Sequence, residues 1–141
     1  MKEYDAVIIG GGAVGSACAR ELARYDLRIA VLEKNLDVCC ETSGRNSGVV
    51  HGGFAYDEGT LKAQLCVEGN REFDKLSQEL GFPFQRTGKL LVGNTNADLK
   101  SLQNTMETGK HNGVTDLVLL DKQEFHKLVP EAQGEFAMYS P

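Results

Sequence analysis

Residues 6–15 read AVIIGGGAVG. The first four form a continuous apolar run, which is typical of a short strand buried on both faces of a sheet. The glycines at 10, 12 and 15 make a GxGxxG pattern, which indicates dinucleotide binding where a strand precedes it and a helix follows. Helix-forming residues over 13–25 and a second apolar run over 27–32 supply that context. The sequence therefore predicts a βαβ unit with parallel strands.

Each residue type in this pattern has a physical role. Gly10 permits a tight turn, Gly12 lets the backbone approach a pyrophosphate, and Gly15 lets the helix lie close to the strands. The amide N–H groups at the start of the helix then face the phosphates. Glu33 ends the second strand, where a carboxylate accepts hydrogen bonds from an adenosine ribose and disfavours a 2′-phosphate. FAD and NAD share this pattern, and a glycine-rich turn with a solvent-facing acid is the alternative without function.

The rest of the chain alternates between helical and extended patterns. A long loop is expected over 34–59, with a short helix near 47–51. The longest helix is predicted to begin after Thr60, a capping residue, and to end at Gly81. Beyond it we expect extended segments over 82–84 and 88–93, a helix over 96–111, a strand over 117–120, a helix from Asp121 to about 129 and a strand over 136–139.

Composition excludes several classes of protein. The chain has 141 residues and a net charge of −5, with no basic stripe that would bind a nucleic acid. It contains no apolar run near the roughly 20 residues of a membrane span, and the start lacks the basic region of a signal peptide. We therefore expect a cytoplasmic protein. The four cysteines show no CxxC spacing, so no metal site is predicted. Cys39 and Cys40 are expected to be reduced loop residues, with a redox or flavin-proximal role as the alternative.

Two later segments are more specific than the glycine pattern. Residues 42–51 read TSGRNSGVVH and residues 59–70 read GTLKAQLCVEGN. With them the chain resembles the N-terminal part of the FAD-dependent oxidoreductases related to D-amino-acid oxidase. Within these it is most similar to the branch of bacterial glycerol-3-phosphate dehydrogenase and L-2-hydroxyglutarate oxidase. The resemblance covers essentially the whole chain.

The resemblance implies an α/β fold. Residues 1–81 would be the N-terminal part of a FAD-binding Rossmann-like domain of the glutathione-reductase type, and residues 82–141 the start of a substrate domain. The chain would then be an N-terminal fragment, inactive by itself. It would expose sheet edges and apolar surface that favour self-association.

The resemblance also implies FAD as the cofactor and assigns residues to it. Thr42 and Ser43 would bind phosphate oxygens, and Lys34 would lie at the adenosine end. The pyrophosphate residues would be Gly10, Gly12, Ala13 and Gly15, the ribose residue Glu33, and the residues near the isoalloxazine Asn46, Ser47, Gly48 and His51.

His51 and Tyr56 are the candidate catalytic residues. His51 is the only histidine in the glycine-rich segment. It could orient a substrate hydroxyl, stabilise flavin charge or form a covalent link, and a hydrogen-bonded structural histidine is the alternative. Tyr56 could contact the substrate.

The expected reaction is oxidation of a small secondary alcohol, with a hydride passing to flavin N5. The first candidate substrate is sn-glycerol 3-phosphate, giving dihydroxyacetone phosphate, and the second is L-2-hydroxyglutarate. Glycerol-3-phosphate dehydrogenases commonly read HGGLRY where residues 51–56 read HGGFAY. The arginine missing at Ala55 weakens the case for phosphate recognition there.

Other functions stay open from the sequence. The electron acceptor would be a quinone, an electron-transfer protein or oxygen, and the intact protein could sit peripherally at a membrane. An NAD-dependent dehydrogenase would share the glycine pattern and Glu33. A non-catalytic nucleotide-binding module is the third alternative.

Overall fold

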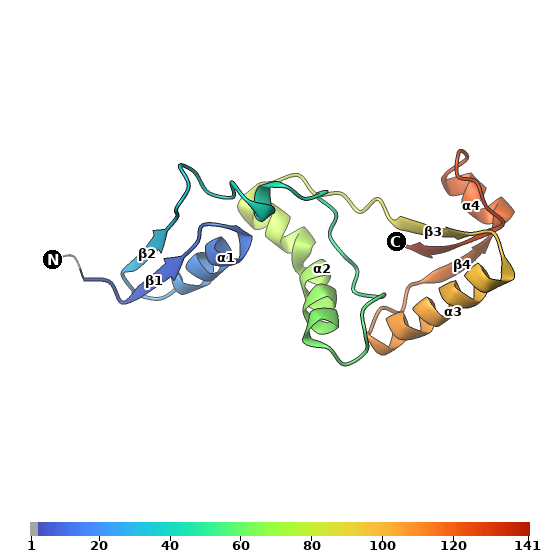
Figure 1. Cartoon of the computed structure of the whole chain (residues 1–141), viewed down its shortest axis with the longest axis horizontal. Helices are drawn as coiled ribbons and strands as arrows, with labels where there is room; N and C mark the ends of the chain where they lie inside the picture. The colour runs from blue at the N-terminus through green and yellow to red at the C-terminus, as the bar shows by residue number, and fades with distance from the viewer. Residues whose placement is uncertain (1–2) are drawn as a thin grey trace. The chain divides into compact units, whose positions relative to one another are not determined.

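The computed structural model describes residues 3–141 (Figure 1). The chain divides into two compact units, one ending at Val49 and the other beginning at Val50. Within the described residues, no helix combines the length and the apolar character needed to cross a membrane.

The first unit contains the predicted βαβ arrangement. Strand β1 (Ala6–Ile9) is followed by helix α1 (Ala13–Leu22) and strand β2 (Ile29–Leu32). The two strands pair in parallel, with Ala6 opposite Ile29 and Ile9 opposite Leu32. Helix α1 ends earlier than predicted because the chain turns immediately after Leu22, with the Arg24 and Tyr25 amides bonded to Glu21 and Leu22 carbonyls.

The prediction that the first strand is buried on both faces is wrong for this chain. Ile8 is half-buried toward α1, whereas Val7 is 51% exposed and Ile9 is 87% exposed. On β2, Val31 and Leu32 are also exposed. The reason is that α1 is the helix in contact with this two-stranded sheet, and it covers one face. As predicted, this sheet exposes apolar surface.

The loop after β2 differs from the sequence prediction. Its one short helical turn is the 3-10 helix η1 (Thr42–Gly44), and the predicted helix near 47–51 is absent. The Asn46 side chain explains this: Nδ2 donates to the Ser43 carbonyl, and Oδ1 accepts from the Gly48 amide. Such local side-chain bonds compete with helix formation. Gly48 also has φ 71°, a left-handed conformation that ends any helical run.

The second unit has three helices and an antiparallel sheet. Helix α2 (Leu61–Leu80) begins at Thr60, whose side chain accepts from the Ala63 amide, and ends at Gly81 with φ 70°. The sheet has the order β3-β5-β4. Its elements are β3 (Lys89–Gly93), α3 (Asn96–His111), β4 (Val118–Asp121), α4 (Lys122–Leu128) and β5 (Phe136–Ser140).

The predicted elements after Gly81 are largely confirmed, because their caps are clear in the sequence. Asp121 forms a capping box with Glu124, which fixes the start of α4. Thr95 and Asp98 form the same arrangement at the start of α3. The exception is residues 82–84, which are extended but pair with no strand.

The hydrophobic core lies in the second unit. Helix α3 contacts β3 and β5, and α4 contacts β4 and β5 (Figure 1). The main cluster of buried side chains comprises Phe54, Leu102, Leu117 and Met138. Phe54 comes from the loop before α2, so that loop is tied to the sheet and to α3.

The division at residues 49 and 50 does not coincide with the predicted boundary at residue 81. Helix α2 packs with the second unit, because Val67 approaches Gly53 closely and Arg71 donates to the Gly113 carbonyl over 2.7 Å. As an assignment of FAD-binding and substrate domains, the ranges 1–81 and 82–141 stay a prediction.

Candidate functional site

The glycine-rich loop has the geometry that its sequence requires. Gly10 has φ 103°, and its amide donates to the Leu32 carbonyl over 2.7 Å, which joins the loop to β2. A Cβ atom on Gly15 would overlap the Gly10 carbonyl oxygen. Gly15 therefore allows α1 to start directly against the turn, so that the first amides of the helix point out of the loop.

Residues predicted to bind phosphate meet at the start of α1. Gly12 is the N-cap of the helix and supplies no side-chain cap. Instead, the Ala13 amide donates to Ser43 Oγ over 2.9 Å, which brings the loop after β2 to the helix N-terminus. A Cβ on Gly12 would lie 3.0 Å from Ser43 Oγ. The helix N-terminus thus combines main-chain donors with a hydroxyl group, as an anion site requires.

Glu33 closes the other side of the glycine-rich loop. Its Oε2 accepts from the Gly11 amide over 2.7 Å, and its Oε1 accepts from the Asn35 amide over 2.9 Å. These bonds, led by the one from Asn35, lower the pKa of the Glu33 carboxyl below its ordinary value of 4.5. Each carboxylate oxygen keeps a second lone pair for a ligand hydroxyl.

The lowered pKa predicts how Glu33 affects stability with pH. A carboxylate with a depressed pKa stabilises the folded state above its ordinary value of 4.5, and this contribution is lost as the pH falls through the lower folded pKa. We expect the difference in unfolding free energy between wild type and Glu33→Gln to shrink as the pH falls below that value. Urea unfolding over a pH series measures it. A difference for Glu33→Gln that stays constant across the pH series would contradict the prediction.

The other predicted cofactor residues lie on the exposed loop after β2. Lys34 pairs with Glu41 over 2.7 Å, and the hydrogen bond to this carboxylate raises the pKa of the lysine. Thr42 is in η1 beside Ser43, and Ser47 follows Asn46 at the end of this segment. Asn46 and Gly48 are joined to each other by a side-chain hydrogen bond.

The first unit fits the FAD that the resemblance implies. An adenosine ribose can bond to Glu33, and a pyrophosphate can bond to Ser43 and to the first-turn amides of α1 other than that of Ala13, which already donates to Ser43 Oγ. The positive φ of Gly10 and the lack of room at Gly15 are features that this cradle needs and a solvent-exposed turn does not.

The two candidate catalytic residues form a pair in the second unit. The Tyr56 hydroxyl lies 3.0 Å from His51 Nδ1, and the rings stack with 24° between their planes. Lys62 Nζ lies 4.2 Å from the centroid of the Tyr56 ring, a cation–π contact that restrains the phenol. With Nδ1 engaged and His51 exposed, Nε2 is the ring nitrogen available to a ligand.

The loop that carries this pair is anchored at its centre. Gly53 has φ 80°, and a Cβ there would lie 2.5 Å from Val67 Cγ2 on α2. The next residue, Phe54, is 5% exposed and packs in the core. Gly53 and Phe54 lie between His51 and Tyr56, and their contacts tie them to α2 and to the sheet. These contacts therefore fix the positions of His51 and Tyr56.

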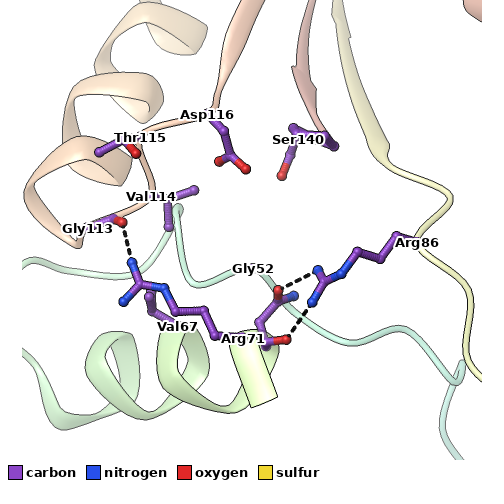
Figure 2. A pocket seen from close by; sticks show the side chains of 11 residues that line it. Gly52, Val67, Arg71, Arg86, Gly113, Val114, Thr115, Asp116 and Ser140 are labelled. Atoms are coloured by element: carbon purple, nitrogen blue, oxygen red, sulfur yellow. Dashed lines mark hydrogen bonds between the residues drawn. The ribbon is translucent and has the colours of Figure 1, made fainter. Parts of the chain in front are cut away.

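A polar pocket of about 230 Å³ lies beside this loop (Figure 2). Figure 2 shows the Arg71 side chain directed toward Gly113, with Arg86, Asp116 and Ser140 also lining the pocket. The Arg71 guanidinium donates to the Gly113 carbonyl, and the Arg86 guanidinium bonds to Asp74 and Asn70. Arg86 is therefore paired with the Asp74 carboxylate, whereas Arg71 is held by a neutral carbonyl oxygen and keeps its positive charge at the pocket, which Asp116 also lines. Its lining residues are Gly52, Val67, Asn70, Arg71, Arg86, Gly113, Val114, Thr115, Asp116, Ser140 and Pro141.

Several residues that shape the site were not predicted from the sequence. Cys39 has φ 57°, and its amide donates to the Gly11 carbonyl over 3.1 Å, so it supports the glycine-rich loop. Asn112 donates to two carbonyls of the loop that carries His51 and Tyr56. Neither residue lies in a motif, and a contact between residues 56 and 112 has no local sequence signal. All four cysteines of the described chain are free.

Comparison with known proteins identifies the family. A family model described as FAD dependent oxidoreductase matches residues 5–141. The chain is 42% identical to a mitochondrial L-2-hydroxyglutarate dehydrogenase of Nematostella vectensis over 99% of its length. Over 90% of its own length, the chain is 39% identical to a glycerol 3-phosphate dehydrogenase of Caloramator mitchellensis. It covers 31% and 26% of these two relatives, so it spans about a third of their length or less.

Solved structures of related proteins share the fold. L-alpha-glycerophosphate oxidase from Mycoplasma pneumoniae, solved with FAD bound, matches 99% of this chain with a TM-score of 0.89 and 29% identity. L-proline dehydrogenase from P. horikoshii matches 99% with a TM-score of 0.82 and 25% identity. The chain covers 38% and 37% of these two structures.

The predicted α/β fold class is confirmed by these structures. Because some relatives are named mitochondrial, the predicted cytoplasmic location stays a prediction. The residue assignments for FAD and catalysis also stay predictions. The chain belongs to the family of FAD-dependent oxidoreductases, and the prediction of FAD as the cofactor is confirmed.

Proposed function

We propose that the protein containing this chain oxidises the CH–OH group of a small anionic hydroxy acid, with L-2-hydroxyglutarate as the first candidate substrate. The observation that carries the proposal is the His51–Tyr56 pair, whose 3.0 Å contact leaves Nε2 available on an anchored loop. When bound, FAD supplies the acceptor for the substrate hydride.

His51 has the role of the base that takes the hydroxyl proton. This role requires Nδ1–H to donate to the Tyr56 hydroxyl, which leaves a lone pair on Nε2 for the proton. The Lys62 ammonium above the Tyr56 ring restrains the phenol, so that the hydroxyl keeps its place at Nδ1. The proton at Nε2 then leaves to solvent, because His51 is exposed.

Two observations favour L-2-hydroxyglutarate over a phosphorylated substrate. Ala55 presents a methyl group at the position where glycerol-3-phosphate dehydrogenases commonly carry an arginine. The curated relative with 42% identity is an L-2-hydroxyglutarate dehydrogenase.

Glycerol 3-phosphate, the first candidate from the sequence alone, is the second candidate substrate in this proposal. The support for it is the 39% identity to the Caloramator mitchellensis glycerol 3-phosphate dehydrogenase. The likeness to the Mycoplasma pneumoniae glycerophosphate oxidase adds to it.

Anaerobic flavin reduction by the intact protein distinguishes these candidates. We expect kcat/KM for L-2-hydroxyglutarate to exceed that for glycerol 3-phosphate by at least about tenfold, which corresponds to roughly 1.4 kcal/mol in transition-state binding. The reverse order would make glycerol 3-phosphate the substrate. Reduction by neither compound would overturn the proposed reaction.

The role of His51 predicts a large kinetic effect. His51→Gln should lower the rate of flavin reduction by about 10²- to 10⁴-fold, because loss of a positioned base removes that much of the rate. FAD content should stay that of wild type. His111→Gln is the matched control, because His111 is exposed and pairs with Glu58. A wild-type rate in His51→Gln would exclude His51 as the base.

A further inference from the structure

The loop that carries His51 and Tyr56 is held by an asparagine distant in the sequence. Asn112 is the C-cap residue of α3. Its Nδ2 donates to the Gly53 carbonyl over 3.1 Å and to the Tyr56 carbonyl over 2.8 Å. An amide nitrogen carries two hydrogens, so each carbonyl receives one. Asn112 is itself half-buried, which strengthens both bonds relative to exposed ones.

These two bonds complete an anchor that begins with Gly53 and Phe54. The close approach of Gly53 to Val67 and the burial of Phe54 fix how deeply the loop sits. These two contacts do not restrict the backbone torsion angles after Phe54. The direction of the Tyr56 side chain depends on those torsion angles. The bond from Asn112 to the Tyr56 carbonyl removes this freedom.

A second side chain supports the His51 end of the loop. Asn70 Nδ2 donates to the His51 carbonyl over 3.4 Å. The amide of Asn70 is oriented by Arg86, because Arg86 Nη1 donates to Asn70 Oδ1 over 3.0 Å. Arg86 is in turn fixed by Asp74, which accepts from Nε over 2.8 Å (Figure 2 shows Arg86 above α2).

We propose that Asn112 is a positioning residue for the His51–Tyr56 pair, with Asn70 supporting the same loop from α2. Its effect on the reaction rests on the proposed function, in which His51 is the base. Its effect on the geometry of the pair does not. The interaction requires an amide, because a carboxylate at residue 112 would place oxygen atoms against two carbonyl oxygens.

Asn112→Asp tests the inference, since it keeps the shape and removes both donors. In the 141-residue chain, ¹⁵N NMR of the imidazole reports whether His51 keeps one ring tautomer, and amide hydrogen exchange reports loop opening. We expect wild type to show a single tautomer. Asn112→Asp should show a mixture, and exchange over residues 51–56 should be faster by roughly tenfold or more, as expected for two lost hydrogen bonds.

Asn104→Asp is the matched control, because Asn104 is exposed on the same helix. It should reproduce the wild-type spectra. If Asn112→Asp matches wild type as Asn104→Asp does, the inference is wrong. Should Asn112→Asp fail to fold, Asn70→Asp gives the second test, because it keeps an acceptor for Arg86 and loses the donor to His51. The inference then requires the same loss of a single tautomer.

Kinetics of the intact protein separate this inference from the proposed function. Asn112→Asp should lower the rate of flavin reduction without changing FAD content, and should add no further loss to His51→Gln, because both changes act on one unit. If Asn112→Asp alters the NMR spectra but neither Asn112→Asp nor His51→Gln lowers the rate of flavin reduction, His51 is not the base. The positioning of the His51–Tyr56 pair by Asn112 would still hold. Losses that add in the double variant would show that Asn112 does not act through His51.

Discussion

Replacing Gly15 with alanine is expected to leave the protein unable to retain FAD. The new Cβ would overlap the Gly10 carbonyl oxygen, which is backbone and cannot rotate away as a side chain does. Moving α1 outward would displace the Ala13 amide from Ser43 and change the turn at Gly10. Overpacking typically costs about 1–3 kcal/mol in cores where side chains adjust, and here the rigid backbone leaves less room to adjust. We therefore expect loss of the cofactor together with lower stability of the first unit.

Gly69→Ala is the control for this change. Gly69 lies within α2, and no atom lies within 4 Å of an added Cβ. Alanine should stabilise the helix there by about 0.5–1 kcal/mol. FAD content per chain, measured by absorbance after purification, should be that of wild type in Gly69→Ala and close to zero in Gly15→Ala. Full FAD content in Gly15→Ala would contradict the proposed cradle.

Phe54→Ala is expected to produce the largest loss of stability in the second unit. The ring is 5% exposed and packs with Leu102, Leu117 and Met138. Removing a buried phenylalanine side chain costs about 3–5 kcal/mol, a large part of the roughly 5–15 kcal/mol that stabilises an ordinary domain. The His51–Tyr56 pair should be lost with it, because Phe54 anchors the loop between them.

Urea denaturation of the 141-residue chain measures this effect. Leu61→Ala serves as the control, because Leu61 is 67% exposed at the start of α2. Its effect should lie within about 0.5 kcal/mol. A loss below about 1 kcal/mol in Phe54→Ala would mean that the loop is not anchored as described, since even a single buried methylene is worth about that much.

Local signals made the secondary structure predictable. Thr60, Gly81 and Asp121 mark helix ends by hydrogen bonds within a few residues of the chain, so their sequence patterns suffice. The glycine pattern of residues 10–15 was predictable for the same reason. The prediction of a short helix near 47–51 was wrong because the Asn46 side chain donates to the Ser43 carbonyl, and this local hydrogen bond competes with helix formation.

Distant contacts were not predictable in this way. Asn112 reaches the loop before α2 only after α3 and the sheet have formed, and no pattern near residue 112 indicates it. Likewise, the exposure of Val7 and Ile9 depends on which elements cover the sheet. A continuous apolar run indicates a strand that is suited to burial on both faces. It does not indicate which elements pack against each face.

The visible absorption spectrum of the intact protein, before and after anaerobic addition of substrate, tests whether it is a flavoenzyme that oxidises L-2-hydroxyglutarate. We expect flavin bands in the purified protein that bleach with L-2-hydroxyglutarate. Bleaching with glycerol 3-phosphate alone would keep the flavoenzyme and change its substrate. A colourless protein that takes up no added FAD would contradict both the FAD cradle of the first unit and the proposed reaction.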